Sequence, residues 1–314
     1  NLFERLVSAG LLSEEQIQGS KRQGKLPAKK SNQPKVSSVQ GFIAKVLSFE
    51  IDSGHEVFYR GHSNKTKSKL EPSLFRKDDD GNYLHLENEH ILYRELLVSN
   101  SADFQYDEYT LDKLVRMQHY SLPTRLLDIT SNPLIALYFA CKSASDEDGE
   151  VIVLSMPRRV IKYFDSDVAS CIANLARLPK SEKDRIDFDA GHFNNQTAVK
   201  RLIHFIKEEK PYFEPEIIPD DLRKIVCVKS KKSNDRISSQ SGAFLLYGLD
   251  AVMDEEGTAD ISVNRISVSN KEKILKDLDL LNINESTVFP YIENSAKYVA
   301  DKYKFNKVLQ AKFC

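Results

Sequence analysis

Residues 117–140 read MQHYSLPTRLLDITSNPLIALYFA, and this stretch decides the fold. It begins inside residues 109–120, whose hydrophobic spacing predicts a helix. Pro123 ends that helix, and residues 125–129 form a short segment typical of a strand. Asn132 and Pro133 then provide a cap and a first-turn proline for a helix over residues 134–142. Because that segment is almost wholly apolar, we expect the helix to be buried.

The other periodic segments are short helices and short strands in mixed order. Strands are expected at residues 56–61, 125–129, 151–156, 224–228 and 243–247, and helices at residues 39–49, 86–98, 109–120, 134–142, 197–207, 271–281 and 291–303. They do not alternate regularly, as they would in a doubly wound parallel sheet. We therefore predict an α+β fold with mixed, mostly antiparallel small sheets surrounded by helices.

The charge balance limits the kinds of protein this chain can be. Its 314 residues include 45 basic and 46 acidic side chains, a formal net charge of −1, and 41% are hydrophobic. This content is enough for a core, and the balance argues against a nucleic-acid coat protein, which is normally strongly basic. The apolar run at residues 134–141 is much shorter than the roughly 20 residues that span a bilayer. Since no secretory signal pattern is found, we expect a cytoplasmic protein with no membrane partner.

Cysteine and histidine spacing gives no indication of a metal site. The four cysteines, Cys141, Cys171, Cys227 and Cys314, are far apart and form no C-x-x-C pair. We expect Cys141, at the end of an apolar helical run, and Cys227, in an apolar strand-like run, to be buried free thiols, and the few cysteines fit a reducing compartment. The segment from His85 to His90 is rich in possible ligands, but its histidine spacing misses the i, i+4 helical register and favours a solvated helix start. No phosphate-binding glycine loop, nucleophile elbow or zinc-protease motif is present.

The N-terminal part differs from the rest in composition. Between Glu15 and Glu50 the chain has no acidic residue but seven lysines and arginines. We divide the chain into a helical N-terminal segment with a basic linker, residues 1–36, and one domain with a C-terminal helical extension, residues 37–314. Two interpretations of the linker stay open: a solvated hinge, or a basic arm that binds nucleic acid or an acidic partner.

Three motifs together point to a known family. Residues 58–62 read FYRGH, residues 70–76 read LEPSLFR, and the stretch 117–140 follows downstream. This combination closely resembles the FRG domain, a family of largely uncharacterised bacterial and phage-associated proteins. The resemblance covers residues 57–141 and continues weakly into residues 236–244 and 287–290. Ser121 stands where the family usually has glycine, and Ile129 where it usually has tryptophan.

A weaker similarity extends to ADP-ribosyltransferases, whose site begins with an aromatic-Arg-Gly strand. In one branch of that family the arginine holds the phosphates or ribose of NAD, and Tyr59, Arg60 and Gly61 match this element. Residues 128–131, which lead into residues 136–140, resemble the second element. Gln240 lies where these enzymes have a catalytic glutamate. The resemblance implies an ADP-ribosyltransferase-like core that takes NAD as substrate, with no metal expected.

The same residues suit a phosphate-bearing ligand on chemical grounds. An arginine fork matches phosphate oxygens bidentately, and the glycine after Arg60 lets a ligand approach the backbone. Arg125, between a proline turn and a strand, can point into the same cleft. The hydroxyls of Thr130 and Ser131 lie at a helix N-terminus, which suits an anion.

Two further residues suit the base or the ribose. His119 offers an imidazole for hydrogen bonding and Tyr120 a ring that can stack on nicotinamide or adenine. Structural alternatives stay open, because Arg60 or Arg125 can instead pair with Asp128, and His119 can be a satisfied buried histidine. Asp128 is also a candidate for an orienting carboxylate in the site.

These observations favour an NAD-binding, ADP-ribosyltransferase-like effector, either a bacterial toxin or an anti-phage defence protein. The expected catalytic residues are Arg60, His119 and Gln240, and cofactor binding is assigned to Tyr59, Arg60, Gly61, Tyr120, Arg125, Asp128, Thr130 and Ser131. Besides the nucleotide, we expect a protein or nucleic-acid acceptor and a regulatory partner protein. The alternatives are a non-catalytic nucleotide or nucleic-acid sensor, and an interaction module whose motif only stabilises the fold.

Overall fold

One mixed sheet runs through the part of the chain that the computed structural model describes, residues 35–231 and 242–290. Its eight strands lie in the order β1-β8-β4-β2-β3-β7-β6-β5. Their bounds are β1 Lys35–Val36, β2 His55–His62, β3 Leu126–Thr130, β4 Gly149–Pro157, β5 Lys162–Tyr163, β6 Ile225–Lys229, β7 Gly242–Tyr247 and β8 Ser262–Val268. The β1–β8 and β5–β6 pairs are parallel, and the other neighbours pair antiparallel.

The α+β prediction is confirmed, but the predicted small sheets are wrong. The strands form a single sheet because β2 and β3 join its two halves through one residue pair, Tyr59 with Thr130. The hydrophobic pattern predicts each strand, but it does not show that these two strands pair, and a single residue pair adds no further signal. The predicted resemblance of this core to ADP-ribosyltransferases stays a prediction.

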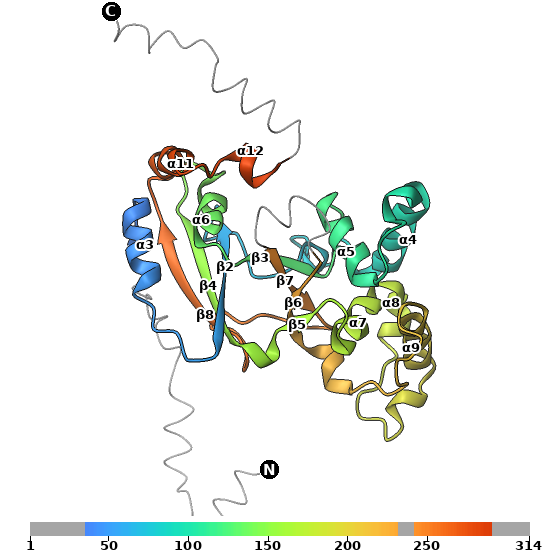
Figure 1. Cartoon of the computed structure of the whole chain (residues 1–314). Helices are drawn as coiled ribbons and strands as arrows, with labels where there is room; N and C mark the ends of the chain where they lie inside the picture. The colour runs from blue at the N-terminus through green and yellow to red at the C-terminus, as the bar shows by residue number, and fades with distance from the viewer. Residues whose placement is uncertain (1–34, 232–241, 291–314) are drawn as a thin grey trace, which may run out of the picture. The chain divides into compact units, whose positions relative to one another are not determined.

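Helices gather over the two halves of the sheet in separate groups (Figure 1). Over the half with β8, β4 and β2 lie α3, α6, α11 and α12, which span Val39–Leu47, Pro133–Cys141, Lys271–Leu280 and Glu285–Val288. Beside the half with β7 and β6 lie α4, α5, α7, α8 and α9, which span Glu89–Ser99, Thr110–His119, Asp167–Asn174, Lys180–Lys183 and Thr197–Glu209. Each group has its own apolar core against the sheet, as an amphipathic helix requires.

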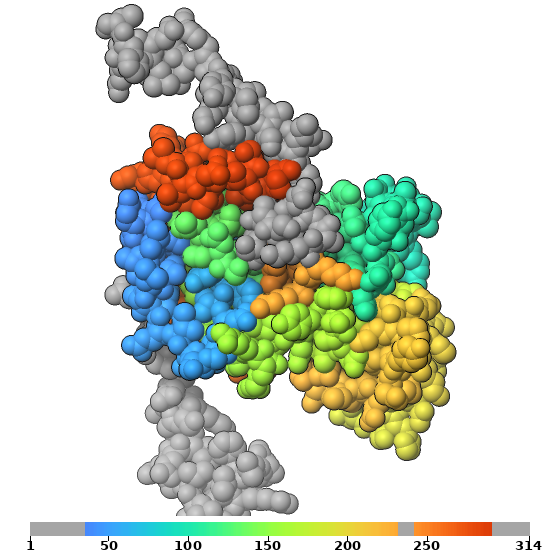
Figure 2. Space-filling view, viewed as in Figure 1, coloured from blue at the N-terminus to red at the C-terminus, as the bar shows by residue number. Residues whose placement is uncertain are grey.

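Helix α6 is the most apolar helix of the first group, and its burial is confirmed. Ala136, Leu137 and Ala140 have no exposed surface. In the space-filling view, α11 and α12 lie against α6 on the side away from the sheet (Figure 2). The ring of Phe139 also meets that of Phe289 edge-on, with 5.7 Å between centroids. Helix α6 is therefore held on both sides.

Other expected elements appear close to their predicted bounds, whereas the sequence did not predict the strands β1, β5 and β8 or the helices α7, α8 and α12. Cys141 and Cys227 are buried and free, as expected, and Cys171 is buried and free as well. The predicted helix at residues 291–303, the N-terminal helices and Cys314 lie outside the described residues. The division between residues 36 and 37 stays a prediction, although Lys35 and Val36 already pair with β8.

Candidate functional site

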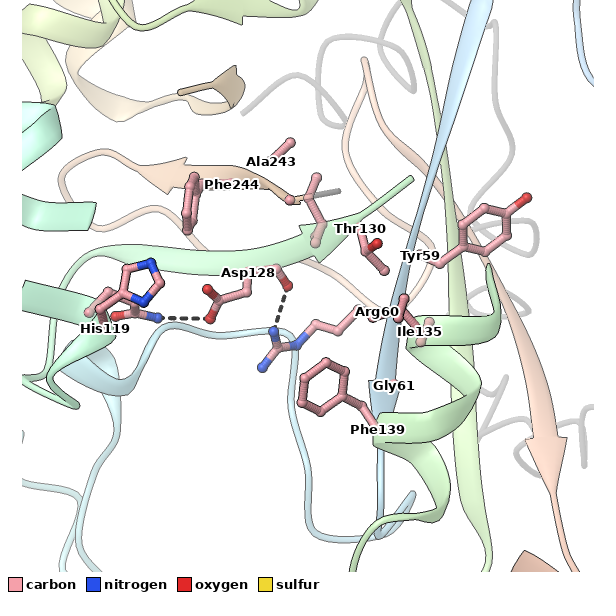
Figure 3. A pocket seen from close by; sticks show the side chains of 14 residues that line it. Tyr59, Arg60, Gly61, His119, Asp128, Thr130, Ile135, Phe139, Ala243 and Phe244 are labelled. Atoms are coloured by element: carbon pink, nitrogen blue, oxygen red, sulfur yellow. Dashed lines mark hydrogen bonds between the residues drawn. The ribbon is translucent and has the colours of Figure 1, made fainter. Parts of the chain in front are cut away.

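A pocket of about 160 Å³ opens where the two halves of the sheet meet (Figure 3). Five elements line it: β2, β3 and β7 from the sheet, and helices α5 and α6. The lining residues are Tyr59, Arg60, Gly61, Gln118, His119, Asp128, Ile129, Thr130, Ile135, Ala136, Phe139, Gly242, Ala243 and Phe244. Six residues that the sequence assigned to the site therefore converge here, from segments about 70 positions apart in the chain.

The pocket exists because β2 and β3 separate after a single pairing. Tyr59 pairs with Thr130, and beyond that point the two strands share no further ladder. Arg60 reaches across the gap, and its Nη1 donates to the backbone oxygen of Asp128 at 2.6 Å. The side chain thus replaces a missing strand-to-strand bond, which fixes the guanidinium at the pocket wall. The predicted Arg60–Asp128 contact forms to the backbone of Asp128 rather than to its carboxylate.

A second hydrogen bond, to His62, also orients the Arg60 side chain. Its Nε donates to Nε2 of His62 at 3.1 Å, and Nδ1 of His62 lies 3.1 Å from Glu150. Nε2 accepts a hydrogen bond from Arg60 here and therefore carries no proton, so the ring is neutral and its Nδ1–H donates to Glu150. Burial lowers the pKa of His62 and favours this neutral form. Glu150 is fixed in turn by Arg265 at 2.8 Å.

Arg60 carries a positive charge that its immediate partners do not neutralise. Both acceptors, a carbonyl and a neutral imidazole, are uncharged. Within residues 35–231 and 242–290, no carboxylate lies at ion-pair distance from Arg60. Burial lowers the pKa of the guanidinium, because the charged form is less well solvated there, and the nearby Asp128 carboxylate acts in the opposite direction. An anion in the pocket would stabilise it.

Gln118 sets the position of Asp128, a role that the sequence interpretation missed. Its Nε2 donates to Oδ2 of Asp128 at 3.0 Å and lies 3.3 Å from the carbonyl of Leu126, while Thr124 donates to its Oε1 at 2.7 Å. With both ends of the amide occupied, the Asp128 carboxylate has a fixed orientation in the pocket wall. Gln118 stands within the quoted motif, but nothing in the sequence distinguished it from a surface polar residue.

The end of α5 places Gln118 and His119 at the pocket. Ser121 has φ 63°, in the left-handed region, and its N–H donates to the carbonyl of Gln118. Leu122 donates to the carbonyl of Met117, which completes a Schellman helix end. Glycine suits this conformation better than serine. This left-handed conformation explains why the family usually has glycine at position 121.

Gly61 lines the pocket and also serves helix packing, while the expected approach of a ligand to its backbone stays a prediction. A Cβ at this position would lie 2.0 Å from the carbonyl oxygen of Ala136 and 2.6 Å from the nitrogen of Ala140. The glycine therefore lets α6 press directly onto β2. Since Ile135, Ala136 and Phe139 line the pocket, this contact also sets the pocket wall.

The cofactor assignment of Arg125 is not supported by its place in the structure. Arg125 is 1% exposed and lies outside the pocket, where its guanidinium makes two bonds to Glu89 at 2.8 and 2.6 Å. Lys183 pairs with the same carboxylate at 2.5 Å. The alternative pairing of Arg125 with Asp128 is also wrong. Glu89 is itself buried, which corrects the prediction of a solvated helix start between His85 and His90.

Two other assigned residues, Tyr120 and Ser131, do not line the pocket. Tyr120 is 59% exposed and does not line the pocket. Ser131 is exposed outside the lining, and the cap of α6 is Asn132, which accepts from Leu134. Thr130 does line the pocket, and its hydroxyl accepts from the Asn132 backbone at 3.0 Å. Gln240 lies outside the described residues.

Residues 35–231 and 242–290 hold no group of three or more histidine, cysteine, aspartate or glutamate side chains placed to bind a metal. Among those same residues, no helix has the length and apolarity to cross a membrane.

The family comparison agrees with the motif and with the pocket. Residues 55–149 match the family model for the FRG domain, so the chain carries an FRG domain. This range contains β2, α5, β3 and α6, and with them all the polar side chains of the pocket. Searches of curated proteins and of solved structures give no match.

Proposed function

We propose that the pocket binds NAD and that the chain cleaves the nicotinamide–ribose bond, as an ADP-ribosyltransferase or an NAD glycohydrolase. The observation that carries this proposal is Arg60, a held guanidinium without a carboxylate partner among the described residues. A pyrophosphate offers the two oxygens that such a fork binds best. The chain would then be an effector, such as a toxin or a defence protein.

The lining of the pocket suits one flat ring rather than a whole dinucleotide. Its walls are apolar and aromatic at Ile135, Phe139 and Phe244, and polar at His119 and Thr130. The volume of about 160 Å³ is below the roughly 300–1,000 Å³ of sites that enclose a complete drug-sized ligand. We therefore assign the nicotinamide end to the pocket and the pyrophosphate to Arg60 at its edge.

Asp128 supplies the charge that bond cleavage requires. In this reaction the bond between ribose C1′ and the nicotinamide nitrogen breaks, neutral nicotinamide leaves with the bonding electrons, and an acceptor bonds to C1′ and loses a proton. Asp128 is the carboxylate in the lining, as far as the described residues show, and Gln118 holds it in place. A fixed carboxylate stabilises the positive charge that develops on the ribose and can orient its hydroxyls.

Calorimetry with NAD and an assay for released nicotinamide test the proposal together. An Arg60→Gln variant removes one charged hydrogen-bonding group worth about 1.5–3 kcal/mol, so NAD binding should weaken by about 10- to 150-fold. The matched control is Arg158→Gln, because Arg158 has a side chain that is 71% exposed and lies outside the pocket. Thermal unfolding of both variants separates lost binding from lost folding.

Three outcomes are decisive. Binding and nicotinamide release that both depend on Arg60 support the proposal. Binding without release contradicts the enzymatic part and favours a nucleotide sensor. Absence of binding at millimolar NAD, or equal binding by Arg60→Gln, overturns the proposal.

A further inference from the structure

A second recess also has Arg60 in its lining and differs from the pocket in its charge. It encloses about 440 Å³, and its charged side chains are Arg60, Lys67, Lys69, Arg76, Lys77 and Glu71. We call it the basic groove. Because Arg60 lines both cavities, the groove and the pocket adjoin at the guanidinium.

The positive charge of the basic groove is not compensated locally. Its lining has five cations against one carboxylate, and the buried ring of His62 is neutral. Among the described residues, none of the lysines at 67, 69 and 77 has an ion-pair partner, and neither does Arg76. Neighbouring Lys65, in contrast, is bound to Asp148 at 2.9 Å. A chain with a net charge of −1 thus concentrates free positive charge beside its candidate site.

We propose that the basic groove binds the phosphates of a single-stranded nucleic acid and presents that strand to the pocket as the acceptor of ADP-ribose. The acceptor role rests on the proposed function, whereas strand binding by the groove does not. In the transfer, a nucleophilic oxygen or nitrogen of the strand bonds to ribose C1′ as the bond to nicotinamide breaks. Neutral nicotinamide leaves, and the proton of the nucleophile goes to solvent.

The groove favours a flexible strand over a duplex. A recess of this size admits a backbone that can bend, and positively charged grooves of this kind follow single strands. A duplex needs a long positive face, but the chain continues after Lys77 with Asp78, Asp79 and Asp80, which lie outside the groove lining. The apolar and aromatic pocket next to Arg60 offers surfaces on which a base can stack.

Salt dependence gives the expected size of the effect. Four phosphate contacts, from Lys67, Lys69, Arg76 and Lys77, predict a slope of about −2.8 in log K against log salt for a single strand. The affinity should fall about 50-fold between about 50 and 200 mM salt. Changing Lys67 and Lys69 to glutamine together should reduce the slope to about −1.4.

Fluorescence anisotropy with labelled single strands of about ten nucleotides, DNA and RNA, tests the binding in the full chain. The matched control is Lys273→Gln with Lys276→Gln, since both lysines are exposed on α11 and outside the groove. The expected result is a slope near −2.8 that the groove variant halves and the control leaves unchanged.

Several results would overturn the inference. Absence of binding at about 50 mM salt, or binding that the groove variant does not change, removes the groove as the site. If a duplex or a phosphopeptide of equal charge binds more strongly than the single strand, the single strand is not the ligand of the groove. Strand binding without label transfer from radiolabelled NAD refutes the acceptor role. Because anisotropy is measured without NAD, failure of the NAD proposal and failure of the groove stay distinguishable.

Discussion

Substitution of Gly61 by alanine tests whether the contact between α6 and β2 sets the pocket. The added Cβ would lie 2.0 Å from the carbonyl oxygen of Ala136, where ordinary contact begins at 3.4 Å, so α6 must retreat by about 1.4 Å at that point. The obstacle is backbone on a buried helix and cannot rotate away. Overpacking of this kind costs about 1–3 kcal/mol, and occasionally more.

Urea unfolding measures that loss, with Gly191→Ala as the matched control. A Cβ on Gly191 meets no atom within 4 Å, so this variant should stay within about 0.5 kcal/mol of wild type. The Gly61 variant should also bind nucleotide less well at any concentration of folded protein, since Phe139 moves with α6. Equal unfolding midpoints for the two variants would refute the packing argument.

Four further predictions concern stability and protonation. Ser121→Gly should raise the free energy of unfolding by up to about 1 kcal/mol, because serine is held at φ 63°; an unchanged or lower thermal midpoint would contradict this. Glu89→Gln should destabilise the chain by about 3–5 kcal/mol, because the two buried cations Arg125 and Lys183 lose their carboxylate partner. Glu87→Gln, at an exposed position, is the control. Equal midpoints of chemical unfolding for the two variants would count against this prediction. Burial opposes ionisation of Glu89, but the two cations lower its pKa from 4.5 to about 2. The ionised carboxylate therefore contributes to the free energy of unfolding above pH 4.5, and this contribution is lost as the pH falls toward 2. Measuring the free energy of unfolding as a function of acid pH checks this prediction. The ring of His62, whose pKa burial lowers from 6.5, should bind its proton at a lower pH than in the unfolded chain, so this group lowers stability as the pH falls; a titration midpoint of His62 at or above pH 6.5 by nitrogen NMR would contradict it.

The position of the site could be predicted from sequence because its residues lie within two compact motifs. Arg60 lies within the predicted strand 56–61, and Asp128 and Thr130 precede a buried helix, so the resemblance identified both sides of the pocket. His62 could also have been found, since residues two apart on a strand share a face with each other. The sequence interpretation quoted His62 but gave it no role.

What could not be predicted depends on contacts between distant segments. The partner of Arg125 is Glu89, 36 residues upstream in a charged segment that is typical of a solvated helix start. Burial of a single glutamate leaves no trace in periodicity. The sequence also gives no indication that the two halves of the sheet are joined, because a single residue pair, Tyr59 with Thr130, joins them.

The basic groove could not be predicted from the sequence either. Lys67, Lys69 and Lys77 stand among polar residues that indicate only a solvated loop. Their significance comes from the fold, which places them beside Arg60 and leaves them without ion-pair partners in the described part of the chain. The sequence interpretation instead placed basic character in the linker.

A crystal structure of the chain soaked with NAD tests the central claim most directly. The account predicts the pyrophosphate on the Arg60 guanidinium and the nicotinamide ring between Phe139 and Phe244, with the ribose close to Asp128. Dinucleotide density at another site, or an Arg60 pocket that stays without ligand at saturating NAD, would contradict it.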